Sequence, residues 1–139
     1  MQRQGSRTVT ASYKVFGDDL SGTYAQLDSG HANFTGGELF MYVAGHKADA
    51  VELHVEPPAN WRVVNGRMER PNQRDWKYPN YEILIDNPTE VGPDWTVDDF
   101  SVDGKTFHIV IHSRGDEAGR RGAFVRDIER VVRAAMRMC

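Results

Sequence analysis

The chain has 139 residues, a hydrophobic fraction of 40% and a formal net charge of −3 at pH 7. This length fits one domain or parts of two, and the acidic balance argues against a nucleic-acid partner, whose binding proteins carry basic patches. No run of about 18 apolar residues is present, so no membrane span is expected, and the single cysteine, Cys139, excludes an intrachain disulfide.

Short strands are predicted along most of the chain, because β-branched and aromatic residues recur at period two between turn residues. We expect residues 1–7 to be disordered. The predicted strands cover residues 8–16, 22–27, 38–44, 50–55, 61–64, 82–86, 95–102 and 105–112. The run 38–44 is almost continuously apolar, which is typical of a strand covered on both faces. The polar stretch 65–79 predicts a long surface loop, and Asp103-Gly104 indicates a hairpin turn.

The last element is predicted to be a helix over residues 116–138, with apolar residues on one side and arginines on the other. Its apolar stripe consists of Phe124, Ile128, Val131 and Ala135, widened by Val125, Val132 and Met136. Because exposed apolar stripes commonly mark association, we expect a homodimer through this helix. No glycine or proline ends it before Cys139, so we expect the sequence to be part of a longer chain.

Together these elements predict a mainly β (α+β) fold, in which an antiparallel β-sandwich-like domain of about eight strands precedes one C-terminal amphipathic helix.

The histidines do not form a recognisable metal site. His108 and His112 have the spacing of a zinc-binding helix, but the residues around them are typical of a strand. On a strand they share one face and lie about 13 Å apart, too far to hold one ion. His31, His46 and His54 are scattered over turns and one strand, so only the fold could bring them together.

No catalytic site is recognisable either. The pairs Asp18-Asp19 and Asp98-Asp99 lie in turn-like settings, which favours solvated turn residues over an acid/base pair in a pocket. No Ser/His/Asp set, phosphate-binding loop or Cys/His pair occurs at a specific spacing. We therefore assign no catalytic, cofactor-binding or metal-binding residue, and we expect no cofactor in this chain.

The three tryptophans are the remaining candidates for a binding surface. Trp61, Trp76 and Trp95 are able to form a stacking platform for a sugar or a peptide. Burial in the core of a sandwich is the more common use of this residue, and both interpretations remain open at this point.

Several segments, taken together in chain order, resemble the N-terminal β-domain of the glycyl aminopeptidase-type metallopeptidases, which are thermolysin-like zinc proteases that usually carry a PDZ domain. The matching segments are Tyr13-x-Val15, Gly36-x-x-Leu39-Phe40-x-Tyr42-Val43, Trp61-x-Val63 and Phe100-x-Val102-x-Gly104. The most specific match is the stretch 81–92, YEILIDNPTEVG. The resemblance covers about residues 8–138.

The resemblance implies a division into a start at 1–7, an N-terminal β-domain at 8–104, and the first strand and helix of a catalytic domain at 105–139. The zinc-binding His-Glu-x-x-His motif of that family is absent from this sequence. The implied function is a non-catalytic fragment that flanks the active-site cleft of its parent. Its partner is then the rest of the protease chain, which holds the zinc. The alternative is a free-standing β-sandwich module that binds carbohydrate or peptide through the tryptophans.

Overall fold

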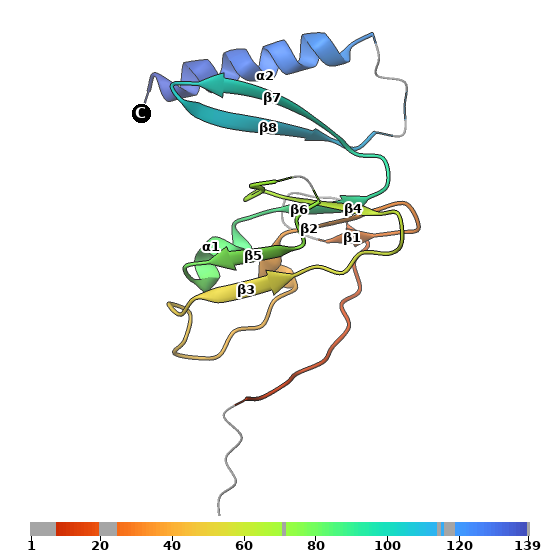
Figure 1. The fold of residues 1–139 in the computed structure, drawn as a ribbon, viewed down its shortest axis with the longest axis vertical. Coiled ribbons are helices and arrows are strands. Elements are labelled where there is room, and N and C mark those ends of the chain that lie inside the picture. Colours follow the sequence, from red (N-terminus) through yellow and green to blue (C-terminus); the bar gives the residue numbers. More distant parts are fainter. Residues whose placement is uncertain (1–7, 20–24, 71, 114, 116–118, 139) are drawn as a thin grey trace, which may run out of the picture.

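A computed structural model describes residues 8–19, 25–70, 72–113, 115 and 119–138. In this part of the chain, eight strands form three antiparallel sheets, and a helix follows the last strand (Figure 1). The predicted fold class, an antiparallel β-sandwich-like arrangement with one C-terminal helix, is confirmed. The predicted disordered start, residues 1–7, lies outside the described residues.

The central layer is a four-stranded sheet with the order β1-β2-β6-β4. Its strands are β1 (Gln26–Leu27), β2 (Ala32–Phe34), β4 (Arg62–Asn65) and β6 (Thr89–Gly92). Neighbouring side chains on a strand point to opposite faces. Val91 of β6 therefore belongs to the hydrophobic core, whereas Glu90 faces the other side of the sheet and lines a pocket.

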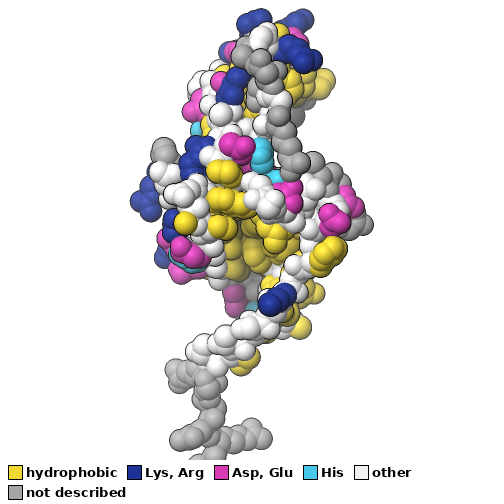
Figure 2. All heavy atoms as spheres, turned by 90° about the vertical axis from the view of Figure 1, so that its right-hand side faces the viewer, with side chains coloured by type: hydrophobic (Ala, Val, Ile, Leu, Met, Phe, Trp, Pro, Cys, Tyr) yellow, Lys and Arg dark blue, Asp and Glu magenta, His cyan; other side chains and the backbone are white. Residues whose placement is uncertain are grey.

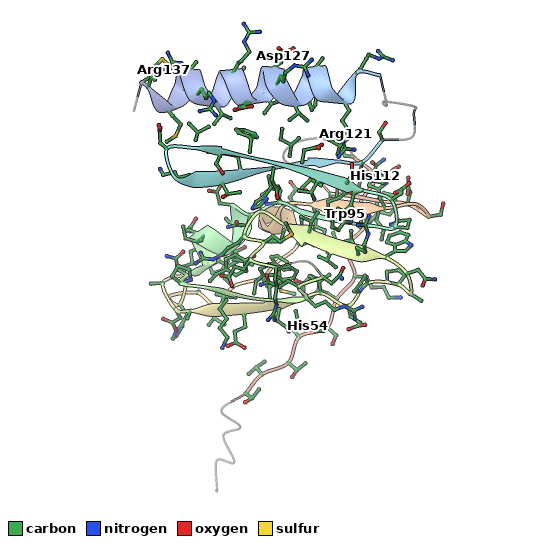
Figure 3. All side chains as sticks on the ribbon, turned by 45° about the horizontal axis from the view of Figure 1, so that its top comes forward. His54, Trp95, His112, Arg121, Asp127 and Arg137 are labelled. Carbon is green, nitrogen blue, oxygen red and sulfur yellow. The ribbon has the colours of Figure 1, made fainter. Side chains whose placement is uncertain are left out.

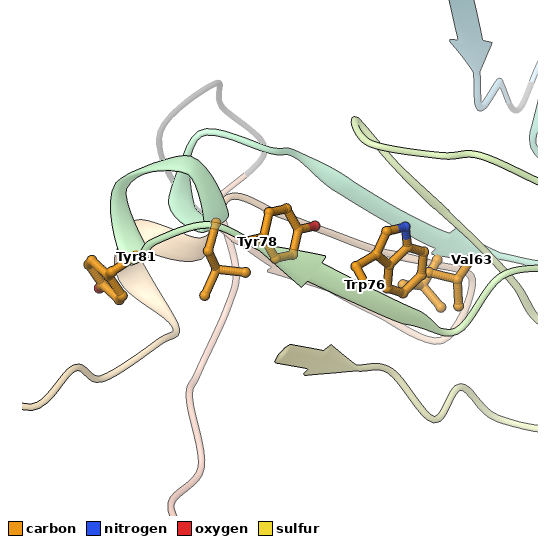
Figure 4. Packing of buried hydrophobic residues seen from close by; sticks show 6 residues of the cluster. Val63, Trp76, Tyr78 and Tyr81 are labelled. Carbon is orange, nitrogen blue, oxygen red and sulfur yellow. The ribbon is translucent and has the colours of Figure 1, made fainter. Parts of the chain in front are cut away.

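A two-stranded sheet packs against one face of this central layer and encloses the core. It pairs β3 (Val51–His54) with β5 (Asp75–Tyr78), so that Leu53 lies opposite Trp76. Figure 4 shows labelled core residues in a row along β5. The buried members of this cluster are Val63, Trp76, Tyr78, Tyr81, Leu84 and Val91.

Strand β5 lies inside the polar stretch 65–79, which the sequence predicted to be a loop. That prediction is wrong for residues 75–78, because Trp76 and Tyr78 are buried while Asp75 and Lys77 between them are exposed. The alternation is that of a half-buried strand, but it spans only four residues and follows a long polar run.

A short helix, α1 (Tyr81–Ile85), occupies the segment predicted to be the strand 82–86. The Asn80 side chain caps this helix by accepting a hydrogen bond of 2.9 Å from the backbone N–H of Ile83. Tyr81 and Leu84, three positions apart, point into the core. The prediction of a strand over 82–86 is therefore wrong. Its apolar run suggested extended backbone, but Asn80 caps a helix here, and Tyr81 and Leu84 lie at the i, i+3 spacing of a helix.

Two further strand predictions, 8–16 and 38–44, are also wrong. Residues 8–16 pair with no described strand, and the nearest bridge joins Asp18 to Gln26. Residues 36–38 form a 3-10 helix, and the apolar run that follows is not a strand, with Val43 69% exposed. A pattern of apolar residues produces a strand only where a neighbouring strand exchanges hydrogen bonds with it.

A hairpin forms the next layer and supports the C-terminal helix. Strands β7 (Thr96–Val102) and β8 (Lys105–Ile111) pair along their whole length. Asp103 and Gly104 connect them with positive φ values of 49° and 76°, as the sequence predicted for this turn. A domain boundary at residue 104 would pass through the turn of this hairpin.

Helix α2 (Arg121–Met136) lies along the hairpin on the side away from the central sheet (Figure 1). It begins later than residue 116, the predicted start, and residues 116–118 lie outside the described part. Arg121 anchors its first turn, because Nε and Nη2 lie 2.7 and 2.6 Å from Asp98 Oδ2. Within the described residues, neither this helix nor any other has the length and apolarity needed to cross a membrane.

Only part of the predicted apolar stripe of α2 is covered by the hairpin. Val125, Ile128, Val132 and Met136 are half-buried, whereas Phe124 and Val131 are 49% and 65% exposed.

Candidate functional site

A pocket of about 460 Å³ lies between the central sheet and the hairpin. The sheet contributes Asn33, Val64 and Glu90 to its lining, and the hairpin side contributes His108, Val110 and His112. Because these residues come from β2, β4, β6 and β8, the pocket marks the junction of two layers that are far apart in sequence. Figure 2 shows histidine and acidic side chains gathered at this junction.

A cluster of three potential metal ligands lies beside this pocket, and two of its members, Glu90 and His112, also line the pocket. His31 precedes β2, Glu90 lies on β6, and His112 directly follows β8. A ring nitrogen of each histidine and a carboxylate oxygen of Glu90 all lie within 4.8 Å of one another. Figure 3 shows His112 where the end of the hairpin meets the central sheet. The fold therefore brings together two imidazoles and one carboxylate from three distant segments.

Hydrogen bonds hold His112 and Glu90 in place. His112 Nδ1 lies 2.8 Å from Glu90 Oε1, and its Nε2 lies 3.0 Å from Asp94 Oδ1. Asn33 Nδ2 donates to the second Glu90 oxygen at 2.9 Å. The side chains of His112 and Glu90 are only 15% and 12% exposed. Both potential ligands are thus largely buried and fixed by outer partners.

His31 is the most deeply buried of the three, with 7% of its surface exposed. Its ring packs edge-on against that of His112 at a centroid distance of 4.6 Å. Its Nδ1 makes no hydrogen bond in the described part of the chain. Asp28 Oδ1 lies 3.4 Å from this nitrogen, but that oxygen accepts the backbone N–H groups of Gly30 and His31. A buried polar atom without a partner requires an explanation.

The structure buries two of the three tryptophans. Trp76 is 2% exposed and belongs to the core, and Trp95 is 5% exposed. The Arg62 guanidinium covers the Trp95 ring at 4.1 Å, and Trp95 Nε1 donates to the Arg62 carbonyl at 3.1 Å. Trp61 is half-buried against the core. Two of the three rings are therefore not accessible for stacking on a sugar or a peptide.

The other histidines contact carboxylates of their own and do not join the cluster. His108 Nδ1 lies 2.6 Å from Asp99 Oδ1, so His108 and His112 have separate partners. On β3, hydrogen bonds to Asp75 and then to Glu56 raise the pKa of His54. On the exposed surface, His46 Nδ1 lies 2.8 Å from Asp49 Oδ2.

Sequence reasoning missed the cluster because its members have no local spacing. Of its residues, His31 was weighed as one of several scattered histidines, and His112 was paired with His108. Glu90 was part of the stretch 81–92 that carried the family resemblance. The signal that would connect them is the pairing of β2 with β6, which sets Asn33 opposite Glu90, and this pairing is not visible in the sequence.

Comparisons with known proteins point to a family. Residues 1–93 match the model of the peptidase M61 N-terminal domain. A crystal structure of an aminopeptidase N family protein from Idiomarina loihiensis is similar, with a TM-score of 0.71 and 26% sequence identity. The similarity covers 86% of this chain and 21% of that chain, so this sequence spans about a fifth of that protein. No curated protein gave a significant match.

Proposed function

Because the family model covers 93 of the 139 residues, the chain belongs to the peptidase M61 family through its N-terminal domain, and we propose that it is a non-catalytic module of a zinc aminopeptidase. The glycyl aminopeptidase type is the proposed parent, on the strength of the stretch 81–92. The proposal includes a longer polypeptide whose remaining domains carry the catalytic residues.

The absence of the His-Glu-x-x-His motif carries the non-catalytic part of this proposal. That motif places two histidines one helical turn apart and a glutamate base beside the metal. None of the 139 residues forms it. In the proposed parent, zinc would activate water for attack on a peptide carbonyl, and this chain would contribute none of the groups that hold it.

The proposed contribution of this chain is to form one wall of the active-site cleft and to help fix where the N-terminus of the substrate lies. The layered arrangement supports this role, because the hairpin and α2 lie at one end of the molecule, beyond the matched residues 1–93. A rigid β-layer held against the following domain is able to restrict how far a peptide extends past the catalytic centre.

The experiment is a hydrolysis assay on the purified 139-residue chain with glycyl and alanyl p-nitroanilides, with and without a chelator. We expect release of p-nitroaniline at the rate of the protein-free blank in both conditions. Turnover that a chelator abolishes would overturn the non-catalytic assignment.

A second experiment tests the proposed parent. The reading frame of the source DNA is expected to continue beyond the codon for Cys139 and to encode His-Glu-x-x-His. A stop codon directly after Cys139 would contradict the fragment interpretation, whatever the outcome of the hydrolysis assay.

A further inference from the structure

We propose that His31, Glu90 and His112 form a binding site for one divalent transition-metal cation of the zinc class. This site joins the β-domain to the hairpin. It departs from the sequence-based expectation that the chain holds no metal, because that expectation compared the histidines with one another and did not join them to Glu90.

The donor set suits such a cation. Imidazole nitrogens and one carboxylate oxygen are ligands that zinc accepts, usually in tetrahedral geometry, with a water or a fourth side chain completing the set. Calcium and magnesium prefer oxygen ligands only, so two imidazoles argue against them. Neither histidine lies on a flexible surface loop tip, since His31 is buried and His112 is 15% exposed.

The distances are compatible with one ion. With zinc–ligand distances near 2.1 Å, ligand atoms of a tetrahedral site lie about 3.4 Å apart. In the structure, His112 Nδ1 and Glu90 Oε1 are 2.8 Å apart, and all three ligand atoms fall within 4.8 Å. Small side-chain rotations that lengthen the distance between His112 Nδ1 and Glu90 Oε1, and shorten the longest distance within the cluster, are enough to place a cation between the three ligand atoms.

An outer shell of hydrogen bonds is already present. Ligating histidines typically donate their other ring N–H to a carboxylate, which fixes the tautomer and the ring orientation. Asp94 Oδ1 occupies this position for His112, at 3.0 Å from Nε2. Asn33 holds the Glu90 oxygen that does not face His112, at 2.9 Å. His112 is therefore oriented to bind through Nδ1, and Glu90 through Oε1.

His31 distinguishes a metal site from a hydrogen-bonded pair. The contacts of His112 with Glu90 and Asp94 would account for those three residues without any ion. It does not account for His31, whose buried Nδ1 has no hydrogen bond in the described residues. Coordination through Nδ1 satisfies this atom directly, and coordination through Nε2 fixes the tautomer whose Nδ1–H faces Asp28.

The proposed site has a structural consequence. His31 and Glu90 belong to the central sheet and its turn, whereas His112 ends the hairpin. The facing side of β8 is otherwise open, since Thr106, His108 and Val110 are exposed. A bound cation would therefore fix the hairpin and α2 against the sheet at one end and define the angle between the two layers.

The test is a calorimetric titration of ZnCl2 into tag-free, chelator-treated protein. We expect one zinc per chain and a rise in the melting temperature on addition of zinc. His31→Ala and Glu90→Gln each remove a direct ligand and are expected to weaken binding by more than about 100-fold, beyond the effect of losing an outer-shell partner. Asp94→Asn, which alters only the outer shell, is expected to weaken it about 10–100-fold. Bound Co²⁺ should give intense visible absorption bands in the wild-type chain and lose them in both ligand variants.

His54→Gln is the matched control, because His54 also contacts two carboxylates, Asp75 and Glu56, but on the exposed surface. This variant is expected to bind zinc as the wild-type chain does. Circular dichroism and urea midpoints of the metal-free variants verify folding, and Glu90→Gln keeps the volume of the side chain. The proposal is overturned if the wild-type chain binds no zinc at stoichiometric addition. It is equally overturned if His31→Ala and Glu90→Gln bind zinc as tightly as the wild-type chain or the control.

Discussion

A buried polar network between the two layers of the β-domain allows a sharp test of the fold. Asn65 Nδ2 donates to Thr89 Oγ1, and the Tyr78 hydroxyl donates to Asn65 Oδ1, both at 2.8 Å. The same Asn65 oxygen accepts the backbone N–H of Arg67 at 2.9 Å. Asn65, Tyr78 and Thr89 are at most 3% exposed, so water cannot replace a lost partner.

Asn65→Ala removes the side chain at the centre of this network. The Tyr78 hydroxyl and Thr89 Oγ1 then stay buried and lose their hydrogen-bond partner. At roughly 1–3 kcal/mol for each unsatisfied buried group, the expected loss in unfolding free energy is about 3 kcal/mol. Tyr78→Phe removes one donor only, because Asn65 Oδ1 keeps the Arg67 N–H, and about 1 kcal/mol is expected. The predicted difference between the two variants is therefore about 2 kcal/mol.

Urea denaturation followed by tryptophan fluorescence measures both losses. For a slope of about 1–3 kcal/mol per molar urea, Asn65→Ala lowers the midpoint by about 1–3 M at unchanged slope. The decisive result is which of the two variants loses more unfolding free energy. If Tyr78→Phe costs as much as Asn65→Ala, or if Asn65→Ala costs less than about 1 kcal/mol, the side chain of Asn65 does not organise the interior as described.

Three further predictions concern the surface and the hairpin. Arg121→Ala removes the contact of two guanidinium nitrogens with Asp98 Oδ2. The two side chains are 25% and 31% exposed, so the variant should lose about 1 kcal/mol of unfolding free energy in urea denaturation. Hydrogen bonds to Asp75 and then Glu56 raise the pKa of His54 above 6.5, so an NMR titration should show this shift, and Asp75→Asn should reduce it. The stability gained from protonated His54 is then complete below the unfolded-state pKa and is lost as pH rises through the higher folded-state pKa. Gly104→Ala should cost about 1 kcal/mol, because Gly104 has φ of 76°.

Each of these predictions has its own control. Gly37→Ala is expected to be nearly neutral, since no atom lies within 4 Å of the added Cβ and φ is not positive there. Asp98→Asn should lower stability by less than Arg121→Ala, because the asparagine oxygen still accepts from Arg121 and the hydrogen bond of Arg121 to Thr96 remains. A His54 pKa at or below 6.5 would contradict the contact with Asp75. Equal losses for Gly104→Ala and Gly37→Ala would contradict the positive-φ turn.

The parts of the fold that the sequence revealed are those with local signals of sufficient length. The strands β7 and β8 have seven residues each and a two-residue turn whose conformation favours Asp-Gly, so their pairing was predictable. Helix α2 has a 3.6-residue period over several turns, which located it despite the error at its start. In both cases the chain segment itself contains the information that determines its structure.

The failures share a different physical cause, which is dependence on distant partners. The apolar run 38–44 has the composition of a strand, but no strand among the described residues pairs with it. Conversely, residues 75–78 lie in a polar stretch of sequence and still form a strand, because they pair with β3 and Trp76 packs in the core. Helix α1 depends on the Asn80 cap. The apolar composition of residues 82–86 favoured a strand and did not indicate this cap.

The candidate site follows the same rule. His31, Glu90 and His112 are separated by 59 and 22 positions in the numbering, and only the pairing of β2 with β6 and the return of β8 bring them together. Each residue alone is typical of an ordinary turn or strand. The family resemblance, in contrast, needed only the order of short motifs. Its coarser part, the N-terminal domain of an aminopeptidase-like protease, agrees with the family model that matches residues 1–93, and the glycyl aminopeptidase type stays a proposal.

The most direct test of the central claim is peptide-bond hydrolysis by the zinc-saturated 139-residue chain, measured beside its Glu90→Gln variant. A non-catalytic N-terminal module predicts that neither protein releases amine above the protein-free blank, even with metal bound at the junction of sheet and hairpin. Turnover by the wild-type chain that both a chelator and Glu90→Gln abolish would contradict this account, because the cluster of His31, Glu90 and His112 would then be an active site.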